Sequence, residues 1–327
     1  MAPGSNTYQC VITNLQGSVA SSVAAVVGVP PPQDAYSVAL IADAPLAYWR
    51  LNEAAGQSVA YDYIGGHSGT YGSATTNGLP GIPSPPFLGV QNELSAGMNN
   101  SVGTAGVGYV TTAGLNLSTN AATLLCWAFP YTNQFNPSGL VFLRSGSSVF
   151  GSQIGGAEAL DYTWGNNSQT YQYGSGLLVP TNQWSFLALT ITPSNAILYV
   201  FNANGQGSAT NIVANAAESF SGGFALGADP QASTLPQRIF DGKLDEVAVF
   251  DYPLSAAQLN QLYALATSGL RLAIQDLGGQ VVVSWPFGAL QQASSLTGPW
   301  TGVAATSPYT NPPTASQVFY RVAAPTP

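Results

Sequence analysis

The chain has 327 residues, of which 46% are hydrophobic and only 6% are charged. Six Lys and Arg residues against 14 Asp and Glu residues give a net charge of −8 and an isoelectric point near 4.2. So few cations exclude nucleic-acid binding, which rests on neutralising phosphates, and no apolar run is long enough for membrane insertion.

The first segment has the pattern of a β-hairpin. Strand residues run from Asn6 to Asn14 and resume at Gly17 in a Val-rich run. The spacing of Tyr8 and Cys10 resembles the last hairpin of an immunoglobulin-like domain, and the alternative is a generic hairpin. We expect residues 1–29 to be the C-terminal fragment of such a domain within a longer, secreted protein whose signal peptide lies elsewhere. Cys10 is then a free thiol, and residues 30–35 form a stiff Pro-rich linker.

The central segment, residues 36–268, consists of short apolar runs separated by Gly, Asn, Ser and Pro. The clearest runs are 123–129, 184–191, 196–200 and 244–250. They are rich in Val, Ile, Tyr, Phe and Thr, and they have the length of strands. Many strands without intervening helices predict a sandwich or a barrel.

One helix is predicted near the end of this segment. Ser255 is a good N-cap, and Gln258 three residues later completes a capping box. Leu254 and Leu259 are placed to form a hydrophobic staple, and Leu262 continues the apolar face. We expect a short helix that packs against the edge of the sandwich.

The last segment, residues 269–327, again shows strand patterns. The apolar runs are 270–274, 281–285 and 318–322, with a further strand around Trp300. Gly and Pro turns separate them. We expect a small β tail module, with Trp285 and Trp300 in its core.

Five motifs in the centre of the chain point to one family. They are the stretches 47–53, 62–71, 183–190 and 244–259, and the strand tryptophan Trp127. In this order and spacing they resemble the laminin-G-like domains of the concanavalin A-like lectin/glucanase superfamily. The resemblance implies an all-β fold, an antiparallel jelly-roll β-sandwich with one short helix near its end and small flanking β segments. It also implies that Trp49, Trp127 and Trp184 belong to the core.

Some members of this superfamily are glycosidases, which need two carboxylates at a short separation. The nearest candidates are Asp245 and Glu246 on the predicted last strand. Adjacent residues of a strand point to opposite faces, so we expect that they do not form such a pair. Two other acid pairs also lack the required alternation: Glu158 with Asp161, and Asp241 with Asp251.

Other catalytic chemistries are not expected. The one histidine, His67, lies in a turn to which the resemblance gives a structural role, so no Ser-His-Asp triad is predicted. A zinc site with several His or Cys ligands cannot be assembled. Cys126, between Leu125 and Trp127, fits a small buried thiol. We therefore expect a protein that is not an enzyme.

The resemblance also suggests a hypothesis of a structural Ca²⁺, because jelly-roll modules of this type often hold one. Calcium takes six to eight oxygen ligands. Asp62, with carbonyls of the turn around Gly65 and Gly66, would supply one side, and Asp245 with Glu53 the other. The alternative is that Asp62 caps its own turn and that Asp245 accepts backbone hydrogen bonds.

Four aromatic residues are the predicted ligand-binding set. Tyr162 and Trp164 alternate on one strand, and Tyr171 and Tyr173 follow the turn at residues 165–169. As a hairpin the four rings would share a face on which a sugar can stack. The alternative is that these rings belong to the core.

Together these patterns predict a non-catalytic extracellular recognition or adhesion module from a larger secreted bacterial protein. Its partner would be a polysaccharide or other glycan, or a cell-surface protein. Two alternatives stay open: an accessory domain of a carbohydrate-active enzyme whose catalytic domain lies outside this chain, or a structural spacer of a surface protein.

Overall fold

The computed structural model describes residues 4–84, 86–90, 93–99, 107–134, 137–146, 148–231, 238–311 and 317–323. The chain divides into two compact units, residues 1–33 and residues 34–327. Within the described residues, no helix is both long and apolar enough to cross a membrane.

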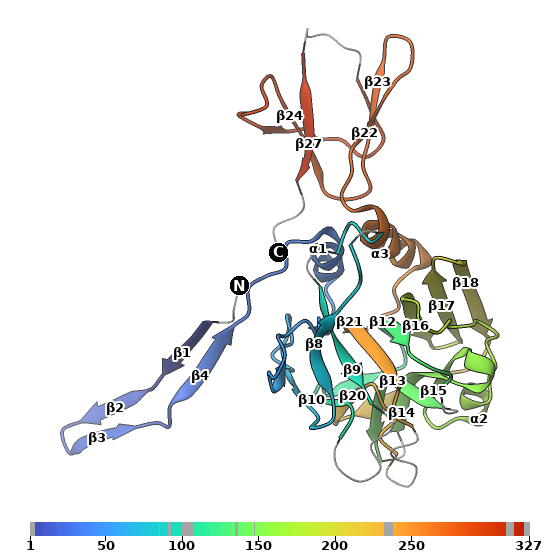
Figure 1. Ribbon diagram of the computed structural model, residues 1–327. Coiled ribbons are helices and arrows are strands. Elements are labelled where there is room, and N and C mark those ends of the chain that lie inside the picture. The colour runs from blue at the N-terminus through green and yellow to red at the C-terminus, as the bar shows by residue number, and fades with distance from the viewer. Residues whose placement is uncertain are drawn as a thin grey trace. The chain divides into compact units, whose positions relative to one another are not determined.

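The first unit is an extended pair of strand ribbons, drawn in dark blue in Figure 1. Strand β1 (Gly4–Tyr8) pairs antiparallel with β4 (Ala24–Gly28), and β2 (Val11–Asn14) pairs with β3 (Gly17–Ala20). The predicted hairpin is therefore formed. Cys10 is an exposed free thiol. The likeness to an immunoglobulin-like domain stays a prediction.

The second unit contains two large antiparallel sheets (Figure 1). The eight-stranded sheet has the order β18-β17-β16-β12-β21-β9-β8, and β5 also pairs with β21. Its strands are β5 (Ala47–Trp49), β8 (Thr76–Pro80), β9 (Leu94–Met98), β12 (Ala122–Pro130), β16 (Ser185–Thr192), β17 (Asn195–Asn202), β18 (Gly205–Asn211) and β21 (Gly242–Phe250).

The seven-stranded sheet has the order β15-β14-β13-β20-β10-β7-β6. Its strands are β6 (Val59–Ala60), β7 (Gly69–Tyr71), β10 (Val110–Gly114), β13 (Ser138–Ser145), β14 (Ser148–Ile154), β15 (Leu160–Trp164) and β20 (Gly223–Leu226). A separate pair joins β11 (Leu117–Thr119) to β19 (Glu218–Phe220). Sequential neighbours such as β16 and β17 are joined by tight turns, whereas β12 pairs with β21 across more than a hundred residues. This long-range antiparallel pairing confirms the predicted jelly-roll sandwich.

The main core lies between the two sheets, and residue alternation explains its composition. On β12, Leu124 and Cys126 face this core, whereas Leu125 and Trp127 face the other side of the sheet. A strand that is apolar on both faces must be covered on both. Cys126 is a buried free thiol as predicted, and burial raises its pKa to about 12.

Two helices cover the outer face of the eight-stranded sheet (Figure 1). These are α1 (Ala35–Ala42) and α3 (Ala256–Ser268), and they contact each other. The predicted capping box of α3 is formed, because Ser255 and Gln258 each bond the other's backbone. Helix α1 was not predicted. Its signal is Asp34, whose carboxylate accepts the backbone N–H of Ser37 as an N-cap.

A β-bulge interrupts β21. Trp127 pairs with Asp245 and Leu125 pairs with Ala248, so two residues of β21 lie opposite Cys126 alone. Glu246 has a φ of 52°, a left-handed conformation that is uncommon for residues other than glycine. The extra residue reverses the alternation of side chains along the strand.

The tail forms two three-stranded sheets. One has the order β22 (Ala273–Asp276), β23 (Val281–Ser284), β26 (Tyr309–Asn311), and the other β25 (Thr301–Gly302), β24 (Ala289–Ala293), β27 (Phe319–Ala323). Trp285 is buried with Val283 and Leu290. Trp300 differs from the prediction, because it is only half-buried and lies under the guanidinium of Arg321.

Candidate functional site

A polar cavity lies on the outer face of the seven-stranded sheet, and we call it the strand-face pocket. Its volume is about 330 Å³. The floor comes from three neighbouring strands, β13, β14 and β15, and the walls come from three segments, those that carry Pro137, Asn166 with Tyr171, and Asp229 with Arg238. The lining residues are Pro137, Phe142, Arg144, Gln153, Asp161, Thr163, Asn166, Tyr171, Asp229, Gln231 and Arg238.

Strand register explains why the floor of the strand-face pocket is flat. Phe142, Gly151 and Thr163 stand in one cross-strand row. A Cβ on Gly151 would lie 2.3 Å from the ring of Phe142, so the ring lies across the backbone of the next strand. The guanidinium of Arg144 in turn lies 5.4 Å from the centre of that ring. A side chain at position 151 would displace the ring, and the floor depends on this glycine.

Two arginines meet on one buried carboxylate at the wall of this pocket. Arg144 donates from Nε and Nη2 to the two oxygens of Asp229, the second bond measuring 2.7 Å. Arg238 donates from Nη1 to the same carboxylate. The Asp229 side chain is fully buried, whereas those of Arg144 and Arg238 keep 22% and 23% of their exposure. The pair is therefore fixed in place and still faces solvent.

Asp161 is the other acid of the pocket. Its Oδ1 accepts the backbone N–H of Ser175 at 3.2 Å. Burial raises its pKa from the ordinary value to about 6, against the opposing effect of that hydrogen bond. The group therefore changes charge in weakly acidic solution.

The four aromatic residues predicted to bind ligand do not share one face. Tyr162 and Trp164 are buried in the core between the sheets, where the Trp164 Nε1 donates to the carbonyl of Ala216. Residues Ser168–Tyr171 form a short helix, α2, in place of the expected second strand. Tyr173 packs against Tyr162, with 6.2 Å between ring centres. Of the four, Tyr171 alone lines the strand-face pocket, with 45% of its surface exposed.

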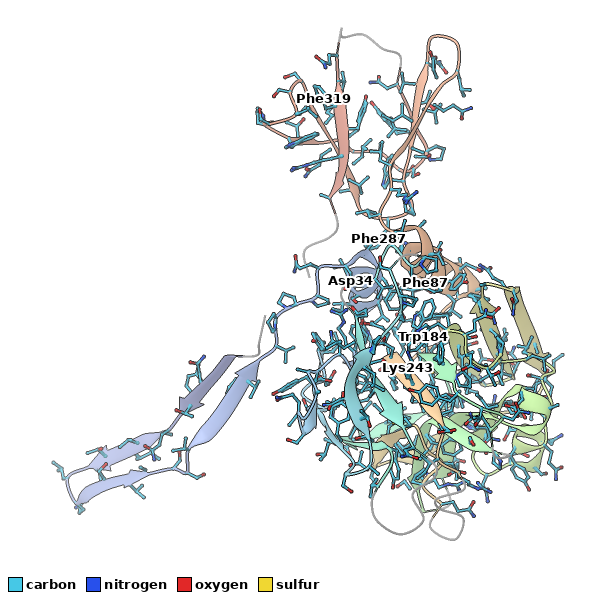
Figure 2. The ribbon with its side chains drawn as sticks, viewed as in Figure 1. Asp34, Phe87, Trp184, Lys243, Phe287 and Phe319 are labelled. Atoms are coloured by element: carbon cyan, nitrogen blue, oxygen red, sulfur yellow. The ribbon has the colours of Figure 1, made fainter. Side chains whose placement is uncertain are left out.

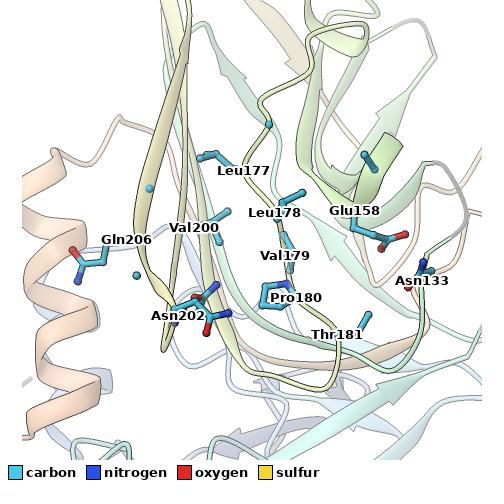
Figure 3. Close-up of a pocket in the computed structure, with 15 residues that line it drawn as sticks. Asn133, Glu158, Leu177, Leu178, Val179, Pro180, Thr181, Val200, Asn202 and Gln206 are labelled. Atoms are coloured by element: carbon cyan, nitrogen blue, oxygen red, sulfur yellow. Dashed lines mark hydrogen bonds between the residues drawn. The ribbon is translucent and has the colours of Figure 1, made fainter.

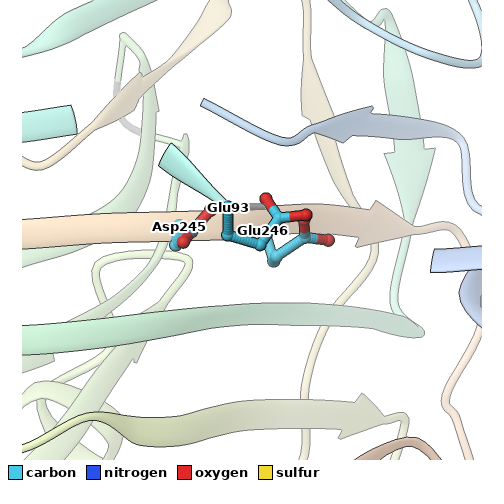
Figure 4. A group of neighbouring side chains, drawn as sticks. All are labelled: Glu93, Asp245 and Glu246. Atoms are coloured by element: carbon cyan, nitrogen blue, oxygen red, sulfur yellow. The ribbon is translucent and has the colours of Figure 1, made fainter. Parts of the chain in front are cut away.

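A second group, the buried carboxylate cluster, consists of Glu93, Asp245 and Glu246 (Figure 4). One oxygen from each lies within 4.8 Å of the others. The expectation that Asp245 and Glu246 point apart was wrong. Leu244 and Val247 both face the inner core, so the bulge turns the two acids between them to the same outer side.

Arg50 holds this cluster together. Its Nε donates to Glu246 Oε1 at 2.9 Å, and its Nη2 donates to Glu93 and lies 3.1 Å from Asp34 Oδ2. The hydroxyl of Tyr48 donates to the other oxygen of Glu246. Prediction from sequence missed Arg50 and Glu93, and it placed Glu246 on the opposite face of the strand from Asp245. An available signal was the arginine itself, since a guanidinium inside an apolar strand motif must meet carboxylates.

The cluster carries more negative charge than its contacts balance. Burial raises the pKa of Asp245 and of Glu246 well above the ordinary values, although Arg50 opposes this at Asp245. Glu93 Oε2 and Asp245 Oδ1 are buried and accept no hydrogen bond in the part of the chain that the structure describes. A hard cation or a shared proton would satisfy them.

The three residues predicted to hold calcium are not brought together. Asp62 accepts four backbone N–H groups, those of Tyr48, Ile64, Gly65 and His67. Glu53 accepts the N–H of Tyr61 and the hydroxyl of Tyr71. The four donors take up the lone pairs of Asp62, which therefore caps its own turn, and Glu53 is engaged by its two donors. Asp245 remains, with the partners Glu93 and Glu246 in place of Asp62 and Glu53.

A larger cavity of about 590 Å³, the edge groove, lies between the loop at residues 176–181 and β17–β18 (Figure 3). Asn133, Asn202 and Gln206 give it amide groups, but Leu177, Leu178, Val179 and Pro180 make one wall apolar. Glu158 lines this groove, whereas Asp161 lines the strand-face pocket. The two acids therefore do not flank a common cavity.

Two neighbouring aromatic rings, Phe129 and Trp184, are covered by the ammonium group of Lys243. Lys243 Nζ lies 4.5 Å from the ring centre of Phe129 and 5.0 Å from that of Trp184 (Figure 2). The same ammonium donates to the carbonyl of Pro80. Trp184 is itself buried, so these rings form no open stacking platform.

The acid pair Asp241 and Asp251 also fails as a catalytic pair. The two residues flank opposite ends of β21, which at about 3.3 Å per residue puts them roughly 30 Å apart. Glycosidase chemistry needs a separation below about 10 Å.

Comparisons with known proteins agree with this fold. Residues 104–260 match the family model described as the concanavalin A-like lectin/glucanases superfamily. The structure adds residues 47–98 to the same sandwich, because β5 and β9 pair with β21. No curated protein matches the chain.

Three solved structures are similar at low identity. Domain 4 of an extracellular GH43 arabinanase from Geobacillus stearothermophilus, in complex with arabinotriose, is 16% identical with a TM-score of 0.45, and the match covers 67% of this chain and 97% of that one. A Trypanosoma rangeli sialidase in complex with sialic acid is 13% identical with a TM-score of 0.45, covering 74% of this chain and 34% of that one. Botulinum neurotoxin type C, whose cell entry depends on two ganglioside molecules, is 12% identical with a TM-score of 0.45, covering 76% and 62%. The chain thus spans about a third of the sialidase.

Proposed function

We propose that this chain, which contains a concanavalin A-like lectin/glucanase domain, is a non-catalytic glycan-binding module that holds a sugar in the strand-face pocket. The observation that carries the proposal is the lining of that pocket. Gln153, Thr163 and Asn166 bring neutral hydrogen-bonding groups to one cavity, beside the half-exposed ring of Tyr171. Sugars are recognised by such groups around an aromatic face.

The positions of the acids support a binding role over catalysis. Asp245 and Glu246 lie close together, but both side chains are fully buried, Asp245 against the loop after β8 and Glu246 against α1. Asp229 is fully engaged by two arginines. This leaves Asp161 as the one acid of the strand-face pocket whose carboxylate is not held by an ion pair among the described residues. Acid–base hydrolysis of a glycoside requires two.

A low charge content with many neutral polar residues supports an extracellular location. In a longer protein, the same module would keep an attached domain close to its polysaccharide. A surface protein would use it for adhesion.

Tyr171→Ala is expected to weaken glycan binding at least about tenfold, a loss of about 1.4 kcal/mol. The reason is that the ring is the stacking surface at the mouth of the pocket. An array of neutral and acidic glycans identifies the tightest ligand of the full chain, and calorimetry compares the variants on it. Tyr131→Ala is the matched control, since Tyr131 is 38% exposed and lies outside the pocket. Equal losses in both variants, or an array without a bound glycan, would contradict the proposal.

We also propose that the buried carboxylate cluster holds a structural Ca²⁺. The two oxygens without donors, Glu93 Oε2 and Asp245 Oδ1, support this, because calcium prefers carboxylate oxygens. A cation would offset the charge that Arg50 leaves unbalanced. It would tie β9 to β21 and would take no part in chemistry.

Calcium is expected to raise the melting temperature of the chain. At a concentration 100-fold above the dissociation constant, the stabilisation is about 2.7 kcal/mol, or about 5–10 °C for a domain of this size. Scanning calorimetry measures the melting temperature in the presence of calcium and in the presence of EDTA. Asp245→Asn should remove the calcium effect. If instead wild type ignores calcium and Asp245→Asn is the more stable protein at pH 7, the cluster holds protons and the calcium proposal is wrong.

A further inference from the structure

The strand-face pocket concentrates positive charge in a chain that has very little. Arg144 and Arg238 are two of only six Lys and Arg residues, and the net charge of the chain is −8. They come from β13 and from the loop before β21, 94 positions apart, and meet on Asp229. The two guanidinium groups and the Asp229 carboxylate sum to a formal charge of +1, which the pocket keeps only while Asp161, its other acid, is protonated. One arginine is enough to neutralise Asp229. The second arginine is therefore available for another role, such as binding a ligand.

The guanidinium groups have donors to spare. Each carries five N–H bonds, and the contacts to Asp229 use only Nε and Nη2 of Arg144 and Nη1 of Arg238. Among the described residues, no hydrogen bond takes up Arg144 Nη1 or Arg238 Nη2. Both side chains keep over a fifth of their exposure and line the cavity. A planar carboxylate is the acceptor that such donors match best.

We infer that the strand-face pocket selects sugars that carry a carboxylate, such as uronic or sialic acids, over neutral sugars of the same size. The inference rests on the proposed glycan-binding function and names its ligand class. The carboxylate would lie against Arg144 and Arg238, and the sugar ring against Tyr171. Phe142 beneath Arg144 fixes the guanidinium plane, so little side-chain freedom is lost on binding.

Asp161 makes this selection depend on pH. The charged groups that face the pocket are Arg144, Arg238, Asp229 and Asp161, and the phenols are Tyr171 and, beside Asp161, Tyr173. An ionised Asp161 repels a sugar carboxylate, whereas a protonated one can donate a hydrogen bond to it. Because burial places the pKa of Asp161 at about 6, affinity for the acidic sugar should rise about tenfold between pH 7 and pH 5. The sugar carboxylate stays ionised over this range.

The test titrates the full chain with methyl glycosides of glucuronic, galacturonic and N-acetylneuraminic acid, each beside its neutral methyl ester. We expect at least one acid to bind tenfold or more tightly than its ester at pH 5. Arg238→Gln should remove this preference, while Arg271→Gln, which changes an exposed arginine outside the pocket, should keep it. If Arg238→Gln does not fold, the variant Asp161→Asn provides a second test of the proposal. It should bind the acid at pH 7 as tightly as wild type does at pH 5.

The outcomes separate the two proposals. Esters or neutral array glycans that bind as tightly as the acids overturn the selection for carboxylates and leave glycan binding standing. An acid that binds equally well to wild type and Arg238→Gln, with no change between pH 5 and 7, also overturns it. If neither acids nor esters bind and the array is empty, glycan binding itself fails.

Discussion

Replacing Arg50 by alanine is expected to cost the protein about 3–5 kcal/mol of unfolding free energy, a large part of the roughly 5–15 kcal/mol that is usual for a folded domain. Arg50 is buried and contacts Asp34, Glu93 and Glu246, whose side chains are at most 4% exposed. Without the guanidinium these carboxylates remain in the core with no positive partner, and removing one partner of a buried ion pair leaves the others uncompensated. Urea unfolding followed by circular dichroism measures the loss.

Two controls define what the loss at Arg50 means. Arg50→Lys keeps the charge but cannot bridge three carboxylates, because an ammonium lacks the planar fork, so it should lose an intermediate amount. Arg271→Ala removes an exposed arginine and should change stability by no more than about 0.5 kcal/mol. A loss below about 1 kcal/mol in Arg50→Ala would mean that the carboxylates are neutral in the folded protein.

The second large effect is expected at Trp127, where truncation to alanine should cost about 3–5 kcal/mol. The indole is fully buried on the outer face of the eight-stranded sheet. Its ring contacts four others: Tyr36 of α1, Phe87, Phe186 and Tyr263 of α3. Both helices would lose their main contact with the sheet, and the cavity is too large for them to close.

The same urea experiment compares Trp127→Ala with two other variants. Trp127→Phe keeps an aromatic ring at this position, so it should cost clearly less. Trp300→Ala, at a half-buried ring of the tail, should leave the unfolding of the sandwich unchanged. If Trp127→Ala and Trp127→Phe are equally stable, the packing between helices and sheet does not depend on this ring.

The fold was largely predictable because its signals are local. The capping box of Ser255 and Gln258 predicts the start of helix α3, and it involves only residues that are close in the sequence. Apolar runs such as 184–191 have strand length and strand residues, and β16 occupies most of that stretch. Each of these features is decided within a few residues, so the sequence carries it directly.

The sites were not predictable in the same way. The orientation of Glu246 depends on one extra residue in β21 opposite Cys126, and strand alternation alone gives the wrong face for it. Tyr162 and Trp164 alternate as a sugar platform would, yet which face of β15 meets the second sheet is a property of the whole sandwich. Of the predicted set, Tyr171 lines the strand-face pocket, and it does so from helix α2.

By itself, the sequence determined the β-rich class, the strands and capped helix of the sandwich, the tail strands and the buried thiol of Cys126, since composition, periodicity and capping act over short distances. The tertiary structure decided which charges meet. Arg144 forms an ion pair with Asp229, 85 positions away in the sequence, and Arg50 forms one with Glu246, 196 positions away. Pairing between strands that are distant in the chain sets these contacts, and desolvation then makes each buried charge require a partner. Candidate sites built from such charges emerge only when the sheets are assembled.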